Sequence, residues 1–197
     1  MNKNVTNKEL KMKADKRFIR SESMIRKAFL SLMESKPYSK IKVTEICQLA
    51  DCSRNAFYLH YETKEHLLSS IIIEITNHVQ RSCQPIVNSL HQVGRKESKQ
   101  YTDQILQAIE ENKHVVTILL KQQQMNFLNC LSNTLIKTMT ECSERLKVTP
   151  NIPFIVYFSN GICGFINYWL TTDLTLEEAQ EILHQTIFYQ YENEIHD

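Results

Sequence analysis

Two adjacent polar side chains, Arg54 and Asn55, have the chemistry needed to distinguish DNA bases. A guanidinium can make paired hydrogen bonds to the edge of guanine, and a carboxamide can do the same with adenine. Both residues follow Ser53, whose hydroxyl can accept from an unpaired amide and so start a helix at Arg54. The spacing therefore predicts two base-reading groups on the first turn of a helix.

The segments on either side predict how that turn is held. A short helix is expected before it, with its apolar face made by Val43, Ile46, Leu49 and Ala50. Asp51 and Ser53 interrupt this pattern and predict a tight turn. In the next helix Phe57 and Tyr61 lie four apart and share the inner face. The residues left facing outward are Arg54, Asn55, Ala56, Tyr58, Leu59 and His60. This arrangement is a helix-turn-helix, a motif whose second helix presents its first turn to the major groove.

The run 53–68, SRNAFYLHYETKEHLL, closely resembles the recognition helix and the start of the next helix in TetR/AcrR-family transcriptional regulators. Its core is Phe-Tyr-x-His-aromatic-x-Thr-Lys-Glu-x-Leu. Upstream, 21–32 and 38–50 are similar to the first and second helices of that family. The resemblance covers residues about 17–72 and is loose beyond them.

The resemblance implies a role for each outward side chain. Arg54, Asn55 and Ala56 would face base edges, and the methyl group of Ala56 could touch that of thymine. Short polar groups and helix N-termini, which are the usual phosphate anchors, would bind the DNA backbone. The DNA-binding residues predicted in this way are Lys42, Thr44, Ser53, Arg54, Asn55, Ala56, Tyr58, Leu59, His60 and Lys64.

Three positions depart from the pattern usual in the family. Asp51 replaces a turn glycine, and aspartate tolerates the left-handed conformation better than most residues. Lys42 stands where Thr or Ser usually caps the second helix; it weakens the cap and adds a charge that phosphate attracts. Asn55 replaces a small residue, so it is a candidate determinant of this protein's own DNA specificity.

Composition favours an all-α fold, because the 197 residues include only three glycines and four prolines and the apolar residues recur at helical spacing. We expect a three-helix DNA-binding domain joined through a fourth helix to a helical ligand-binding and dimerisation domain. The expected divisions are a flexible basic arm (1–16), the helix-turn-helix domain (17–66) and the effector-binding and dimerisation domain (67–197). Residues 1–66 hold fourteen Lys or Arg against eight Asp or Glu, whereas 67–197 hold nine against fourteen. A basic N-terminal region favours contact with DNA phosphates.

Within these divisions the first helix is expected to begin at Ser21, and the fourth to break or kink at Gln84-Pro85. An exposed connection is expected at 94–99 and a separation of two helices near Asn112. A long helix should then reach about residue 146. The most apolar segment, 154–170, is short and polar for a membrane span and is expected to be a buried helix. A final helix should follow Thr175, which can form a capping box with Glu178.

The last two helices are candidates for a dimer interface. By resemblance, the segment around Gly161 and Gly164 implies a dimer face, and two helices from each subunit could form a four-helix bundle. The alternative is that both helices complete the core of the monomer. A homodimer is expected, because a palindromic double-stranded DNA operator with two half-sites requires a two-fold pair.

The family resemblance also implies a cavity for a small-molecule effector among the helices of 101–171, lined by apolar and a few polar side chains. The candidate lining residues are Tyr101, Tyr157, Phe158, Asn160, Phe165, Tyr168 and Trp169. The function expected is a cytoplasmic repressor that the effector releases from its operator. The alternative is a co-regulator of the same fold whose C-terminal domain docks a protein partner.

Other chemistries are less well supported. Cys47, Cys52, His60 and His66 could suggest zinc, but their spacing is too short for a usual finger and Cys47 should face the core. The chain has no glycine-rich phosphate loop or nucleophile elbow, so we expect no enzyme, cofactor or metal. With no secretory signal in the polar N-terminal stretch, the six cysteines are expected to be reduced cytosolic thiols.

Overall fold

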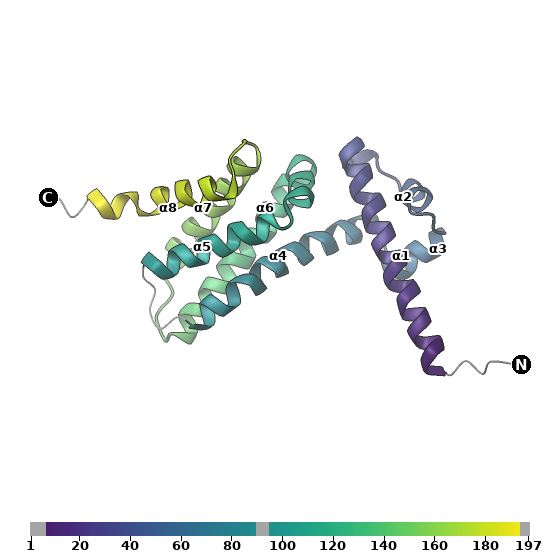
Figure 1. Cartoon of the computed structure of the whole chain (residues 1–197), viewed down its shortest axis with the longest axis horizontal. Coiled ribbons are helices and arrows are strands. Elements are labelled where there is room, and N and C mark those ends of the chain that lie inside the picture. The colour runs from purple at the N-terminus through teal and green to yellow at the C-terminus, as the bar shows by residue number, and fades with distance from the viewer. Residues whose placement is uncertain (1–6, 90–94, 194–197) are drawn as a thin grey trace, which may run out of the picture. The chain divides into compact units, whose positions relative to one another are not determined.

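The computed structural model describes residues 7–89 and 95–193, and all regular elements in these ranges are helical (Figure 1). Their bounds are α1 Asn7–Ser35, the 3-10 helix η1 Tyr38–Lys40, α2 Val43–Leu49, α3 Arg54–His60, α4 Lys64–Ser89, α5 Arg95–Glu110, α6 Lys113–Arg145, α7 Ile152–Leu170 and α8 Leu176–Asn193. The expected all-α class is confirmed for the described part of the chain.

The chain divides into two compact units, Met1–Ile71 and Ile72–Asp197. Helix α4 passes from the first unit into the second, since its residues 64–71 belong to unit 1 and 72–89 to unit 2. A continuous helix therefore links them covalently.

Unit 1 is a small bundle in which α1 packs against α2 and α3. Its core consists of fully buried side chains from four helices, namely Ile25, Phe29, Met33, Ile46, Phe57 and Leu67. Because α1, α2 and α3 bury little apolar surface by themselves, the start of α4 supplies the remaining wall. The buried side chain of Phe57 anchors α3 in this core.

The N-terminal boundary of α1 differs from the prediction. The helix begins at Asn7 instead of Ser21, so residues 7–16 of the expected flexible arm are helical, while 1–6 lie outside the described residues. Ser21 is not a cap: its Oγ donates to the Phe18 carbonyl oxygen at 2.9 Å. Lys, Glu, Ala and Arg are good helix formers and can extend a helix without an apolar stripe.

Two predicted interruptions near residue 90, a break at Gln84-Pro85 and an exposed connection at 94–99, differ from the structure. Helix α4 contains Pro85 and continues to Ser89, so the Gln84-Pro85 pair does not end it. A proline removes one N–H from the helix ladder and its ring crowds the preceding turn, but α4 continues through Pro85. Residues 95–99 of the expected connection form the first turns of α5, and 90–94 lie outside the described residues.

In unit 2, α6 packs against α7 and α5 packs against both α6 and α8. Trp169 is fully buried, and its indole N–H donates to the Leu174 carbonyl oxygen at 3.1 Å, which ties the end of α7 to the turn before α8. The capping box before α8 is confirmed, because the Glu178 amide donates to Thr175 Oγ1 at 3.2 Å and the Thr175 amide to the Glu178 carboxylate at 2.8 Å. The expected separation near Asn112 is confirmed as well.

Helix α6 contains two stretches that the spacing of apolar residues predicts as separate helices. At Gln123 the backbone leaves the helical region, with φ −145° and ψ 39°, and the helix resumes beyond this kink. Within the described residues, no helix is both long and apolar enough to cross a membrane. All six cysteines are free thiols, and four of them are buried.

Candidate nucleic-acid interface

The turn between α2 and α3 has the geometry that the motif requires. Asp51 adopts φ +49°. This confirms that it takes the left-handed conformation expected of the turn glycine that it replaces. The Cys52 amide then donates to the Cys47 carbonyl oxygen at 3.0 Å and closes the end of α2. Ser53 caps α3 by accepting from the Ala56 amide at 3.1 Å. Each bond satisfies a group that a helix terminus leaves unpaired, so the direction of α3 is fixed by local chemistry.

The outward face of α3 carries the predicted base-reading groups. Arg54 and Asn55 are exposed, as are Tyr58 and Leu59, whose exposed fractions are 47% and 75%. The hydroxyl of Tyr58 lies one turn from the Arg54 guanidinium, and the hydrogen bond between the two side chains raises the pKa of Arg54. Ala56 is half-buried at the edge of this face.

The start of α2 is held by an acidic residue. The Lys42 amide donates to the Glu45 carboxylate at 2.9 Å, and Glu45 also pairs with Lys36 at the end of α1. The hydrogen bond from Lys36, followed by that from the Lys42 backbone, lowers the pKa of Glu45. Glu45 therefore supplies the cap that Lys42 lacks. The Lys42 and Thr44 side chains remain exposed beside it, as does Ser53.

His60 is held inside unit 1, although the pattern placed it on the outward face. Its Nε2 lies 2.7 Å from Ser21 Oγ, and its ring lies on Phe18 with the centroids 4.0 Å apart. Its Nδ1 is buried and has no hydrogen-bond partner among the described residues. Burial lowers the pKa of His60, against a smaller opposing effect of the Glu22 carboxylate. His60 thus fixes the end of α3 against α1.

The lowered pKa of His60 predicts a pH dependence of unit 1. Because the folded state binds the His60 proton more weakly than the unfolded chain does, whose ordinary pKa is 6.5, stability should fall as the pH drops through 6.5 toward the lower folded value. Hydrogen exchange of the α3 amides between pH 5 and 8, corrected for intrinsic rates, should show faster opening on the acid side. His60→Gln should remove most of that change, and an unaltered pH profile in this variant would contradict the assignment.

Lys64 is also engaged within the protein. Its ammonium donates to the carbonyl oxygens of Tyr38 at 3.1 Å and Ile41 at 3.0 Å, and it lies 4.4 Å from the centroid of the Tyr38 ring. The Tyr38 hydroxyl in turn donates to the Glu65 carboxylate at 3.0 Å. A lysine at a helix N-terminus opposes the helix dipole, and the carbonyl groups at the end of η1 compensate for this. Lys64 therefore clamps η1 to the start of α4.

Some features of this surface are not evident from the sequence pattern. Leu49 is 54% exposed, although its spacing placed it on the inner face of α2. The Tyr61 hydroxyl donates to the Glu22 carboxylate at 3.2 Å, so two side chains of the α3 end, Tyr61 and His60, contact α1. These contacts join residues 39 positions apart. No short-range signal in the sequence could identify them.

The seven candidate effector-lining residues lie in different environments. Tyr101 and Trp169 are buried in the core of unit 2, whereas Tyr157 and Tyr168 are 79% and 53% exposed on α7. Asn160 is exposed; its side-chain oxygen accepts from Ser132 Oγ at 3.1 Å. The half-buried rings are Phe158, which stacks on Phe154 with centroids 5.7 Å apart, and Phe165, which lies 6.2 Å from Tyr168. The aromatic residues of α7 thus range from fully buried to exposed.

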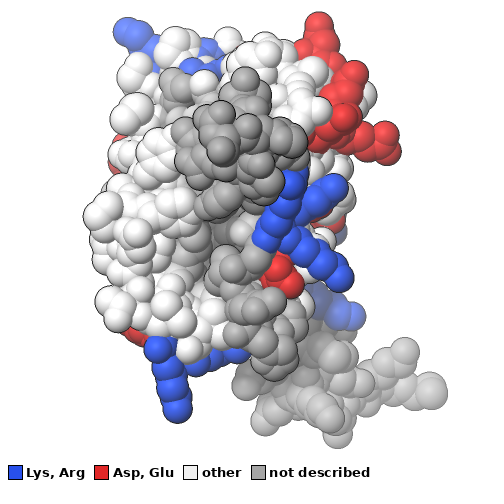
Figure 2. Space-filling view, turned by 90° about the vertical axis from the view of Figure 1, so that its left-hand side faces the viewer, with Lys and Arg blue, Asp and Glu red and all other residues white. Residues whose placement is uncertain are grey.

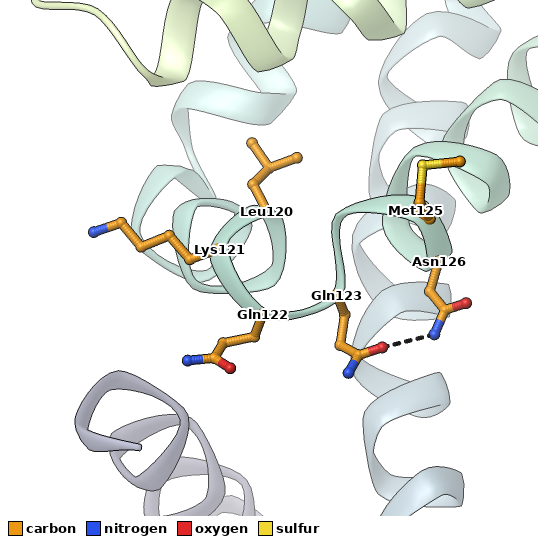
Figure 3. A pocket seen from close by; sticks show the side chains of 6 residues that line it. All are labelled: Leu120, Lys121, Gln122, Gln123, Met125 and Asn126. Atoms are coloured by element: carbon orange, nitrogen blue, oxygen red, sulfur yellow. Dashed lines mark hydrogen bonds between the residues drawn. The ribbon is translucent and has the colours of Figure 1, made fainter. Parts of the chain in front are cut away.

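A depression of about 330 Å³ lies instead at the kink of α6 (Figure 3). It is open to solvent and is lined by a single short stretch, Leu120, Lys121, Gln122, Gln123, Met125 and Asn126. The Asn126 amide donates to Gln123 Oε1 at 2.8 Å across the kink, as the dashed line in Figure 3 shows. Since one segment alone lines it, this depression lacks the convergent groups of a ligand site.

Two of the four residues that suggested zinc have other partners, and a third is buried. Cys47 is buried, His60 contacts Ser21, and His66 Nδ1 accepts from the Glu62 amide at 3.3 Å. In the part of the chain that the structure describes, no group of three or more His, Cys, Asp or Glu residues is placed to hold a metal ion.

Comparisons with known proteins agree with this geometry. Residues 96–189 match a family model described as "Transcriptional regulator C-terminal region". The chain is 33% identical over 84 residues to the HTH-type transcriptional regulator YxbF of Bacillus subtilis (42% of this chain, 20% of that protein). It is 41% identical over 56 residues to DhaS of Lactococcus lactis, named an HTH-type dhaKLM operon transcriptional activator (28% of this chain, 30% of that protein).

The matched segments therefore span less than a third of either relative's own length. Among solved structures, a TetR transcriptional regulator from Streptococcus agalactiae superposes with a TM-score of 0.65 at 24% identity, over 89% of this chain and 98% of that one. This likeness shows that the chain has the fold of TetR-type transcriptional regulators, and residues 96–189 match the C-terminal region of such regulators.

Proposed function

We propose that this protein binds a palindromic double-stranded DNA operator as a homodimer, with the first turn of α3 in the major groove of each half-site. The observation that carries the proposal is the orientation of α3. Its Phe57 side chain is fully buried, so Arg54, Asn55 and Tyr58 face outward from a helix that Ser53 caps. A fixed helix with a guanidinium and a carboxamide on its first turn matches the donor and acceptor pattern of base edges.

The surrounding groups support contact with the DNA backbone. Thr44, Ser53 and the Lys42 side chain are exposed beside the turn, and residues 1–66 carry an excess of basic residues. The start of α4 adds helix N-terminal amides close to the end of α3 in the sequence. Such groups position a protein on the duplex without reading its sequence. In this proposal Lys64 and His60 act on DNA indirectly, by holding α4 and α3 in place.

The proposed division of labour assigns residues 17–66 to DNA binding and 67–197 to effector binding and dimerisation. Helix α4 belongs to both compact units, so a ligand that changes its position within unit 2 can change the presentation of α3. An effector with higher affinity for the altered state would release the operator, and DNA would weaken effector binding equally. We propose a cytoplasmic repressor that works in this way.

The surface of α7 supports the dimer part of the proposal. This helix contains no charged residue in its 19 positions, and Phe154, Tyr157 and Tyr168 expose apolar rings on its outer side. Figure 2 shows an area without charged side chains on the left of its view, with Asp and Glu at the upper right and Lys and Arg at the right and below. Gly161 and Gly164 lie on the exposed side of α7, and no atom lies within 4 Å of a Cβ placed on either. A second copy could therefore approach the α7 backbone closely.

Replacing Gly164 tests this dimer surface, because the same change should stabilise a free helix face and weaken association at a close-packed interface. On a free helix face, Gly164→Ala should raise stability by about 0.5–1 kcal/mol. At a close-packed dimer interface the added methyl group should weaken association, and Gly164→Leu should weaken it further. Sedimentation equilibrium over a concentration series measures the dimer dissociation constant. The control is Asn129→Leu, because Asn129 is exposed on α6. A Gly164→Leu protein that dimerises like the parent would contradict this interface.

The experiment that tests the function is selection of bound duplexes from a random pool by the full-length chain. The proposal expects one enriched sequence with two inverted half-sites about one helical turn apart, or a multiple of that distance. A reporter gene placed behind the selected sequence should be expressed less when the protein is present. A pool that shows no enrichment would contradict operator binding, and increased expression would contradict the assignment as a repressor.

A further inference from the structure

Two backbone hydrogen bonds at the end of α2 bring Cys52 back onto Cys47. The Cys52 amide donates to the Cys47 carbonyl oxygen at 3.0 Å, and the Asp51 amide donates to the Gln48 carbonyl oxygen at 3.4 Å. With Asp51 in the left-handed region, these bonds form a Schellman motif. In this motif the third residue from the helix end and the second residue beyond the C-cap are frequently in contact. Here both of these positions are cysteines, Cys47 and Cys52.

The backbone bond also limits the distance between the two cysteines. An amide nitrogen lies about 1.5 Å from its own Cα and a carbonyl oxygen about 2.4 Å from its own, so an N···O distance of 3.0 Å keeps the two Cα atoms within about 6.9 Å. The separation is smaller than this limit unless all four atoms lie on one line. Disulfides span Cα distances of about 4.4–6.8 Å. The backbone of the turn therefore already has a separation that a disulfide can bridge.

The two side chains meet as well. Burial is the main cause that raises the pKa of Cys52 to about 11, and the next is the adjacent Cys47 thiol, with which Cys52 shares a hydrogen bond. Cys47 is 4% exposed, whereas Cys52 is half-buried. Both are free thiols. Cys52 is thus the thiol that a small molecule can reach from solvent, and Cys47 lies against it.

We propose that Cys47 and Cys52 form a dithiol site that low-molecular-weight disulfides oxidise to an intramolecular disulfide, and that this bridge holds the turn before α3. The Cys52 thiolate attacks one sulfur of the small disulfide and releases one small thiolate. The Cys47 thiolate then attacks the Cys52 sulfur of the mixed disulfide and releases the second. The protein loses two electrons, its two thiol protons pass to the released thiolates, and the small disulfide becomes two small thiols.

The bridge would act on the segment that presents α3. Cys52 directly precedes Ser53, the N-cap of α3, and Cys47 lies in α2 next to the fully buried Ile46. A covalent link between the two cysteines removes conformations from the opened chain, so the folded turn is favoured. Since the Cα separation already fits, the turn need not move to accept the bridge. The reaction does not involve DNA, so it can be tested apart from operator binding.

The chemical test treats the native full-length chain with oxidised glutathione at pH 8, blocks the remaining thiols and analyses tryptic peptides by mass spectrometry. Cleavage after Lys42 and Arg54 releases the peptide 43–54, which holds Cys47 and Cys52 and no other cysteine. In the parent this peptide should lose two hydrogen atoms and carry no glutathione. The exposed Cys130 is the internal comparison and should carry only the glutathione adduct.

Two variants separate the steps of the reaction. Cys47→Ala should keep a stable glutathione adduct on Cys52, because the second attacking thiol is missing, and Cys52→Ser should yield neither the adduct nor the bridge in this peptide. An adduct that persists on Cys52 of the parent without a bridge would overturn the proposal. Reaction at Cys130 alone, or a bridge that forms only in urea-unfolded protein, would overturn it equally.

Hydrogen exchange tests the effect of the bridge on the turn. The α3 amides should exchange roughly 5- to 30-fold more slowly in the oxidised parent than in the reduced parent. Treated Cys52→Ser is the matched control, because it carries the same adduct at Cys130, and its α3 amides should exchange as in the untreated variant. Equal or faster exchange of α3 in the oxidised parent would overturn the claim that the bridge holds the turn.

Discussion

Replacing Arg54 with alanine should weaken binding to the selected operator by roughly 5- to 150-fold, equivalent to about 1–3 kcal/mol, while binding to unrelated duplexes should change much less. The guanidinium is exposed on the first turn of α3, and its hydrogen bond with Tyr58 holds it along the outward face. Competition titrations with single-base variants of the operator should show relaxed preference at one position in each half-site.

The matched control is Arg54→Lys, which keeps the charge and removes the paired donors. This variant should retain the salt dependence of binding and lose the base preference. Arg54→Ala should lose the preference and, if the charge also lies near phosphate, lower the slope of log affinity against log salt by about one. Unchanged base preference in both variants would exclude Arg54 from base reading.

Replacing Lys64 with methionine should lower the free energy of unfolding by about 2 kcal/mol and weaken binding to all DNA sequences alike. The methionine side chain keeps the apolar contact with Tyr38, but the carbonyl groups of Tyr38 and Ile41 lose their charged donor. The connection from η1 to α2 would then be released from the start of α4. Urea unfolding and operator titrations over a salt series measure the two effects.

The salt series separates two roles for Lys64. If Lys64 only holds η1 against α4, the variant should bind DNA more weakly with an unchanged slope of log affinity against log salt, because no ion pair with phosphate is lost. The exposed Lys42→Met is the comparison and should lower the slope by about one without a loss of stability. If Lys64→Met instead lowers the slope and leaves stability unchanged, Lys64 contacts phosphate directly, as the family resemblance implies.

Local patterns identify the helix-turn-helix because its determinants lie within a few residues of each other. The cap at Ser53, the left-handed turn at Asp51 and the inward pair Phe57 and Tyr61 are all readable from residues 51–61, and the structure confirms them. The capping box at Thr175 is of the same kind. In the two caps, a side chain accepts from a backbone amide three residues away.

Features that depend on distant partners are not readable in this way. His60 and Lys64 carry polar groups that suit phosphate, but each is engaged by residues 23 to 39 positions earlier in the chain. Pro85 ordinarily signals a helix end, yet α4 continues past it to Ser89. Helical spacing also places the aromatic residues of α7 on one helix without showing which side is buried, so Tyr157 and Trp169 lie in opposite environments.

The measurement that tests the account most directly is methylation protection of guanine N7 on the selected duplex. Guanine N7 lies in the major groove, where Arg54 is expected to bind. The account predicts protection of symmetry-related guanines in two half-sites about one helical turn apart, or a multiple of that, and its loss in Arg54→Ala at a protein concentration that still saturates the duplex. Protection that persists unchanged in Arg54→Ala, or a bound duplex with no protected guanine in the major groove, would contradict the placement of α3 against DNA.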